Sequence, residues 1–261
     1  MAIVKDQLQR NIELNTVPKR IVSLVPSQTE LLCDLGLEDA IVGITKFCVH
    51  PNHLLATKIK VGGTKQVHYE KIKALQPDII LCNKEENAQD MIQTLEGIAP
   101  VHISDIYTIE DSLELIRMYG VIFNISGTAQ NLIEAIKKSK TEFEDFIRIK
   151  PLKTVAYFIW KSPWMVAANN TFINYMLALN RLDNVFANQS RYPEIDVNTI
   201  KISPDLVFLS SEPYPFNQNH INTVQTYLPN SKIVLVDGEM FSWYGSRLIK
   251  AFVYFKDLSG V

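Results

Sequence analysis

The sequence of 261 residues has little net charge and few cysteines. Its 26 lysines and arginines stand against 28 aspartates and glutamates, which gives a formal net charge of −2 without a basic stripe. Nucleic-acid binding needs a basic surface, so we expect no nucleic-acid partner. The three cysteines, Cys33, Cys48 and Cys82, are odd in number and widely spaced. That pattern argues against a framework of disulfides.

Long apolar runs are missing as well. Spanning a bilayer takes about 20 consecutive apolar residues, and the sequence has no such run, so we expect no direct membrane insertion. The opening stretch, MAIVKDQLQRNIELN, shows neither the apolar core and cleavage site of a signal peptide nor a cysteine that could carry a lipid. We therefore predict a cytoplasmic protein, or a periplasmic one if the chain has been trimmed. Residues 1–18 read as a polar extension without an assigned role.

Motifs for nucleotides, metals or catalysis are weak. The stretch Gly62-Gly63-Thr64-Lys65 lacks the spacing of a P-loop. Cys48, His50 and His53 form a C-x-H-x-x-H pattern, but zinc sites use three or four ligands, and the pattern lies beside a proline rather than on a clear helix face. A nucleophile paired with a base is not visible. We predict a protein that is not an enzyme and that holds neither a metal nor an intrinsic cofactor.

Short β-branched runs alternate with helical patterns in the first half of the chain. This alternation is typical of a parallel α/β layer. The predicted strands are Ile21–Val25, Ile41–Thr45, Asp78–Cys82 and Val101–Ser104. The predicted helices are Gln28–Leu35, Tyr69–Ala74, Asn87–Glu96 and Ile109–Phe123.

A long polar segment, Thr128–Ile149, repeats apolar residues at helical spacing and ends before Pro151; as a helix it would reach roughly 33 Å. The strand–helix alternation then restarts, with strands at Thr154–Trp160, Asp205–Leu209 and Lys232–Val236. We predict an α/β fold with two Rossmann-like α/β lobes, residues 1–126 and 151–261. One long backbone helix, residues 127–150, joins them.

The first strand runs into Pro26, and Ser27 and Glu30 then have the S-x-x-E spacing of a capping box. We expect Ser27 to cap the helix that follows. The free amides at such a strand-to-helix corner can hold an anion or a polar group of a ligand. We therefore also expect Ser27 to border a binding site.

Aromatic and charged residues gather after the predicted strands, where ligands of open parallel sheets bind. All three tryptophans lie there. Aromatic loops at one sheet edge favour a ligand cleft, although packing beneath long loops is the alternative. Lysines mixed with glutamates suit a large, flat ligand with a polar rim. The candidate ligand-binding residues are Ser27, Lys46, Phe47, Lys65, Lys84, Glu85, Glu86, Trp160, Trp164, Glu212, Tyr214, Phe216, Ser242, Trp243 and Tyr244.

Four segments, taken in order, cover most of the chain: KRIVSLVPSQTELLCDLGLEDAIVGIT, YEKIKALQPDIIL, SPDLVFLSSEP and WYGSRLIKA. Their order resembles the class III substrate-binding proteins, the family that includes the vitamin B12 and ferric siderophore receptors of ABC importers. The fold of that family is similar to the two lobes and the long helix predicted above.

The resemblance implies binding of a metal chelate in the cleft between the two lobes. This chelate would be a corrinoid such as cobalamin, a ferric siderophore or haem. It implies a monomeric substrate-binding component of an ABC-type importer, or a cytoplasmic relative of one. It adds Arg247 to the ligand contacts and Glu70 as a docking residue for a permease, while the second lobe offers Asp196 or Asn198 in place of a clear glutamate. The alternatives are a cytoplasmic enzyme or carrier that handles such a chelate, and a scaffold protein that has lost its ligand.

Overall fold

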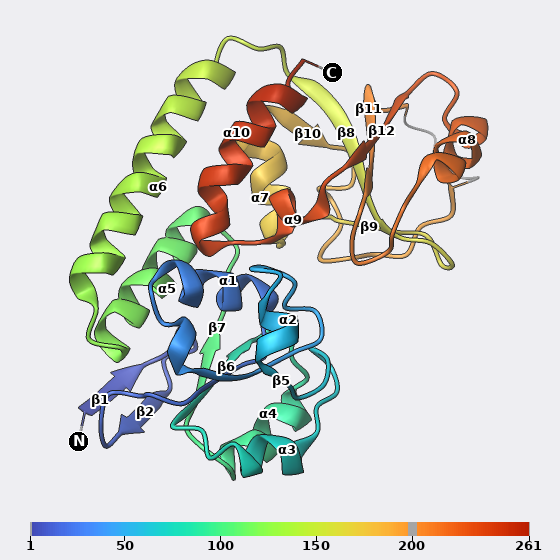
Figure 1. Cartoon of the computed structure of the whole chain (residues 1–261). Coiled ribbons are helices and arrows are strands. Elements are labelled where there is room, and N and C mark those ends of the chain that lie inside the picture. Colours follow the sequence, from blue (N-terminus) through green and yellow to red (C-terminus); the bar gives the residue numbers. More distant parts are fainter. Residues whose placement is uncertain (1, 198–202, 261) are drawn as a thin grey trace. The chain divides into compact units, whose positions relative to one another are not determined.

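A computed structural model of the chain describes residues 2–197 and 203–260 (Figure 1). The chain divides into two compact units. Unit 1 contains the residues up to Lys137 together with Tyr244–Arg247. Unit 2 contains Lys138–Trp243 and the residues from Leu248 onward.

Unit 1 is built on a parallel sheet with the strand order β5-β4-β3-β6-β7. Both β3 and β6 are buried along their whole length, which is typical of a parallel sheet covered on its two faces. The strands are β3 (Ile21–Ser23), β4 (Ile41–Ile44), β5 (Ile59–Lys60), β6 (Ile79–Asn83) and β7 (Val101–Ser104). The helices are α1 (Pro26–Asp34), α2 (Leu54–Thr57), α3 (Tyr69–Ala74), α4 (Gln89–Glu96) and α5 (Ile109–Ile122), with a 3-10 turn, η1, at Glu38–Ala40.

Unit 2 repeats this plan. Its parallel strands follow the order β10-β8-β11-β12, and the short β9 pairs antiparallel with β8. Buried aromatic rings, among them Tyr157, Phe208 and Phe241, fill the space beside β8 and β11. The strands are β8 (Lys153–Trp160), β9 (Met165–Val166), β10 (Leu182–Asn184), β11 (Leu206–Ser210) and β12 (Lys232–Val236). The helices are α7 (Phe172–Leu179), α8 (Gln218–Tyr227), α9 (Gly238–Ser242) and α10 (Leu248–Leu258).

The long helix α6 (Ser126–Ile147) carries the chain from unit 1 into unit 2 (Figure 1). The predicted fold class, two α/β lobes with parallel sheets and one long helix, is confirmed. The division between the units falls inside this helix, after Lys137. The 3-10 turn η3 (Gly245–Arg247) groups with unit 1, although the sequence analysis places it in a lobe of residues 151–261.

The predicted capping box is wrong. Helix α1 begins at Pro26, two residues earlier than the box requires, and its N-cap is Val25. Proline fits the first position of a helix because that position needs no amide donor. Ser27 therefore lies inside the first turn, and the Glu30 carboxylate bonds the Arg247 guanidinium instead.

The N-terminal segment folds as a β-hairpin, which the sequence analysis did not predict. Strands β1 (Ala2–Lys5) and β2 (Asn11–Leu14) pair antiparallel. Ile12 and Leu14 turn inward, while Asn11 and Glu13 face solvent. Within the described ranges, no helix combines the length and the apolar character that a membrane span demands.

Candidate functional site

The loop that follows β6 is shaped by two asparagines. The backbone amide of Asn83 donates to Asn87 Oδ1 at 2.7 Å, and Asn83 Oδ1 accepts from the amides of Glu85 and Glu86 at 2.8 and 3.1 Å. The Lys65 ammonium donates to the backbone oxygen of Glu85 at 2.6 Å. The loop therefore holds three candidate residues, Lys65, Glu85 and Glu86, together at the carboxyl end of β6. Sequence reasoning missed the asparagines, whose signal is an Asn pair four residues apart directly after a strand.

Two lysines of unit 1 lie beside aromatic rings. Phe47 is 49% exposed, and Lys46 Nζ lies 5.0 Å from the centre of its ring. Lys84 Nζ contacts Asp105 at 2.6 Å and lies 5.8 Å from the ring centre of Tyr107. The hydrogen bond with Asp105 is the main reason why the pKa of Lys84 is raised. Both arrangements present a cation next to an aromatic face, a geometry that is favourable by itself.

A buried polar network joins α1 to the segment Tyr244–Arg247. Gln28 Nε2 donates to Ser104 Oγ at 2.7 Å and to the Tyr244 hydroxyl at 2.9 Å. The Tyr119 hydroxyl donates to Gln28 Oε1 at 2.5 Å. Burial raises the pKa of both tyrosines. Sequence reasoning named Tyr244 but missed Gln28, which is the centre of this network.

Arg247 and Glu30 form a buried ion pair within unit 1. Arg247 Nε lies 2.7 Å from Glu30 Oε2, and a second guanidinium nitrogen lies 3.0 Å from Oε1. Each side chain is only 4% exposed. Ser27 is buried beside them at the start of α1. Two predicted ligand contacts, Ser27 and Arg247, thus lie inside unit 1, and their role toward a ligand stays a prediction.

In unit 2 the strand-end aromatics form one cluster. The ring of Trp160 meets Tyr214 edge-on at 5.5 Å, and Tyr214 lies 4.8 Å from Phe216. Trp164 stacks on Phe216 at 6.1 Å with the rings 10° apart. Phe216 is buried, whereas Trp160 is 39% exposed. The structure therefore brings four predicted residues together and leaves Trp160 as the most accessible ring among them.

Glu212 is fixed by two other candidate residues. Its Oε1 accepts from Ser242 Oγ at 2.8 Å and from Trp243 Nε1 at 2.9 Å. Burial raises the pKa of Glu212, and these two hydrogen bonds oppose that rise. The indole of Trp243 is buried, so its contact with Glu212 ties the loop after β11 to the end of α9.

Gly238 leaves the room that this loop needs. A Cβ at position 238 would lie 2.3 Å from Ser210 Oγ and 2.7 Å from Glu212 Cγ. Since overpacking costs about 1–3 kcal/mol, Gly238→Ala is expected to lower the free energy of unfolding by that amount in urea denaturation. Gly127→Ala in α6, where a Cβ meets nothing within 4 Å, is the control and should leave stability unchanged or slightly raised. Equal stability of the two variants would contradict the expectation.

The predicted docking residue Glu70 is exposed in the first turn of α3. Asp196 is exposed too, while Asn198 lies outside the described residues. In the described parts of the chain, no three His, Cys, Asp or Glu side chains gather as they would around a metal ion. His53 bonds Glu38 at 2.7 Å. That the loops of both units line one cleft stays a prediction.

Comparison with known proteins gives consistent similarities. A family model described as "Periplasmic binding protein" matches residues 21–227. An uncharacterized ABC transporter substrate-binding lipoprotein of Bacillus subtilis, YvrC, is 27% identical over 213 residues, covering 78% of this chain and 67% of that protein. A vitamin B12-binding protein of Yersinia pseudotuberculosis is 25% identical over 246 residues, covering 89% of this chain and 84% of that one. The solved structure of a periplasmic heme-binding protein from Pseudomonas aeruginosa shares the fold, with a TM-score of 0.81 over 92% of each chain and 20% identity.

Proposed function

Because this chain belongs to the periplasmic binding protein family, we propose that it binds a metal chelate without chemically changing it. The ligand class is a corrinoid such as cobalamin, a ferric siderophore or haem. Vitamin B12 and heme are the ligands in the names of two of the similar proteins. A chelate already satisfies most of its metal's coordination, so the protein has to hold mainly the periphery of the ligand.

The pairing of aromatic rings with ammonium groups at the strand ends of both units carries this proposal. In unit 1 the pair is Phe47 with Lys46, and in unit 2 Lys161 Nζ lies 5.7 Å from the ring centre of Trp164, next to the exposed Trp160. Aromatic faces bury the broad apolar faces of a macrocycle. Lysine ammonium groups pair with the acidic or amide groups at its rim.

We further propose that the protein acts with an ABC permease as its substrate-binding component. Glu70 is an exposed carboxylate in the first turn of the short helix α3, and it is suited to pairing with a basic surface of such a partner. A monomer is expected to suffice for this role. We also propose that the protein is cytoplasmic, or periplasmic if the chain has been trimmed.

Titration with chelates tests the proposal. Cobalamin, haem and a ferric hydroxamate siderophore, each added separately, are expected to include one compound that quenches tryptophan fluorescence to saturation at a one-to-one ratio. The quenching would arise because Trp160 lies exposed in the strand-end cluster of unit 2. Absence of saturable binding for all three classes would overturn the proposal.

A single substitution then locates the binding surface. For the chelate that binds, Trp160→Ala is expected to weaken affinity about tenfold, equivalent to about 1.4 kcal/mol, because a ring face is lost. Isothermal calorimetry measures this without relying on the removed fluorophore. Tyr227→Ala, which removes an equally exposed ring at the end of α8, is the matched control. An unchanged affinity in Trp160→Ala would exclude Trp160 as a contact of the chelate.

A further inference from the structure

The strand β7 is the terminal strand of the unit 1 sheet in the described strand order. The amide of Ile80 on β6 donates to the oxygen of Pro100, and the amide of Lys84 donates to the oxygen of Ser104. Backbone groups of a strand alternate between its two sides. The groups of Val101, Ile103 and Asp105 therefore point away from β6, toward the side where a further strand could pair.

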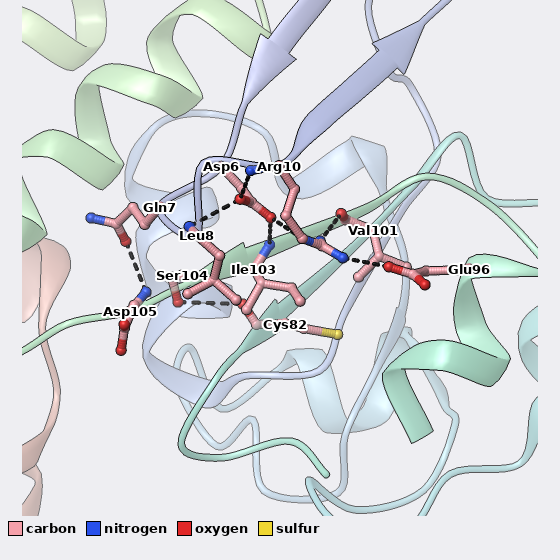
Figure 2. A network of polar contacts seen from close by, with 10 residues as sticks. All are labelled: Asp6, Gln7, Leu8, Arg10, Cys82, Glu96, Val101, Ile103, Ser104 and Asp105. Carbon is pink, nitrogen blue, oxygen red and sulfur yellow. Dashed lines mark hydrogen bonds and ion pairs between the residues drawn. The ribbon is translucent and has the colours of Figure 1, made fainter. Parts of the chain in front are cut away.

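Side chains from the N-terminal hairpin occupy these positions (Figure 2). Arg10 donates from a terminal nitrogen to the Val101 oxygen at 2.8 Å. Asp6 Oδ2 accepts from the Ile103 amide at 3.3 Å. Gln7 Oε1 accepts from the Asp105 amide at 3.1 Å. Three successive outward positions, two on β7 and one directly after it, thus each bond a side chain rather than a backbone group.

The loop that supplies them, Asp6–Arg10, holds its own shape. Asp6 is fully buried, and its Oδ1 accepts from the amides of Leu8 and Arg10, each at 3.0 Å. Its Oδ2 accepts from Arg10 Nε at 2.7 Å. Arg10 also pairs with Glu96 at the end of α4 (Figure 2). The carboxylate and the guanidinium therefore fix the loop and the strand edge in one network.

We infer that the Asp6–Arg10 loop, hereafter the edge cap, keeps β7 from pairing with a second copy of this chain. Unpaired edges of sheets are templates for association, and a further strand would only move the edge outward. The edge cap ends the sheet because side-chain atoms present no new backbone ladder. A second copy is the fitting partner, since two identical uncapped edges can pair about a two-fold axis.

Residue-resolved amide hydrogen exchange tests the capping contacts. Asp6→Ala is expected to speed exchange of the Ile103 amide about tenfold, as for the loss of one hydrogen bond. Gln7→Ala, which removes a neutral side chain, is expected to speed exchange of the Asp105 amide in the same way. The Leu24 amide, which donates to the Leu81 oxygen inside the sheet, should keep its protection and so reports an intact fold. Glu13→Ala on β2, which removes an exposed carboxylate of the same hairpin, is the matched control.

Light scattering after size-exclusion chromatography tests the covering role. Asp6→Ala, or the Asp6→Ala/Gln7→Ala double variant, is expected to form dimers at protein concentrations where wild type and Glu13→Ala do not. If Asp6→Ala fails to fold, Gln7→Ala with Leu24 still protected carries both measurements. Unchanged exchange at Ile103 and Asp105 would overturn the inference, and so would faster exchange without any added association.

Discussion

Replacing Arg247 with alanine is expected to lower the free energy of unfolding by about 3–5 kcal/mol, the range seen when one partner of a buried ion pair is removed. The reason is that the Glu30 carboxylate, only 4% exposed, would lose the guanidinium that contacts both of its oxygens. Urea denaturation at neutral pH, followed by circular dichroism, measures the loss.

The double variant Glu30→Gln/Arg247→Met is the control for this prediction. It removes both charges while keeping similar volumes, and it should recover much of the stability because a buried pair is often replaceable by neutral groups. The same variants address the predicted ligand contact at Arg247. If Arg247→Ala keeps the stability of the wild type but loses affinity for a chelate, the ion pair matters little and the ligand role is favoured.

Acid is expected to destabilise the protein through His102 on β7. Burial lowers the pKa of His102 to about 4, against about 6.5 in an unfolded chain. As the pH falls below 6.5, the unfolded state takes up the proton before the folded state does. Above pH 6.5 the ring is neutral in both states, so His102 does not lower the free energy of unfolding there. Between pH 6.5 and pH 4 the free energy of unfolding falls progressively by about 3 kcal/mol.

The surroundings of His102 explain this shift. Among the described residues, neither ring nitrogen has a hydrogen-bond partner, and the ring packs edge-on against Tyr119 at 5.4 Å. His102→Leu should flatten the dependence of stability on pH between 6.5 and 4, measured by urea denaturation at each pH. His68→Leu, at an exposed histidine, should leave the slope as in wild type. An unchanged slope in His102→Leu would assign the acid sensitivity to other groups.

The alternation of strands and helices could be predicted because each element carries its own local signal. The helix Tyr69–Ala74 agrees with α3 at both ends, and the predicted strand Asp78–Cys82 differs from β6 by one residue at each end. The hairpin β1–β2 was missed since its strands are four residues each and the intervening DQLQR contains none of the glycine or asparagine turns that mark hairpins.

For the candidate site too, local sequence signals could be predicted from the sequence and contacts between distant residues could not. Residues after strands could be found because parallel strands end at one edge of a sheet, and Trp160, Trp164, Tyr214 and Phe216 do cluster. The role of Glu30 could not be found, since its partner is 217 residues away. A spacing rule reads only neighbours in sequence, and here a proline at the first helical position overrode it.

The placement of Tyr244–Arg247 has a consequence for biosynthesis. Three groups of unit 1 bond partners that come late in the sequence. Gln28 bonds Tyr244, Glu30 bonds Arg247, and the Ser112 hydroxyl accepts from the Gly245 amide at 2.9 Å. During synthesis, these three groups of unit 1 lack their partners until residue 247 has been made. The interior of unit 1 therefore cannot be completed by its first 137 residues alone.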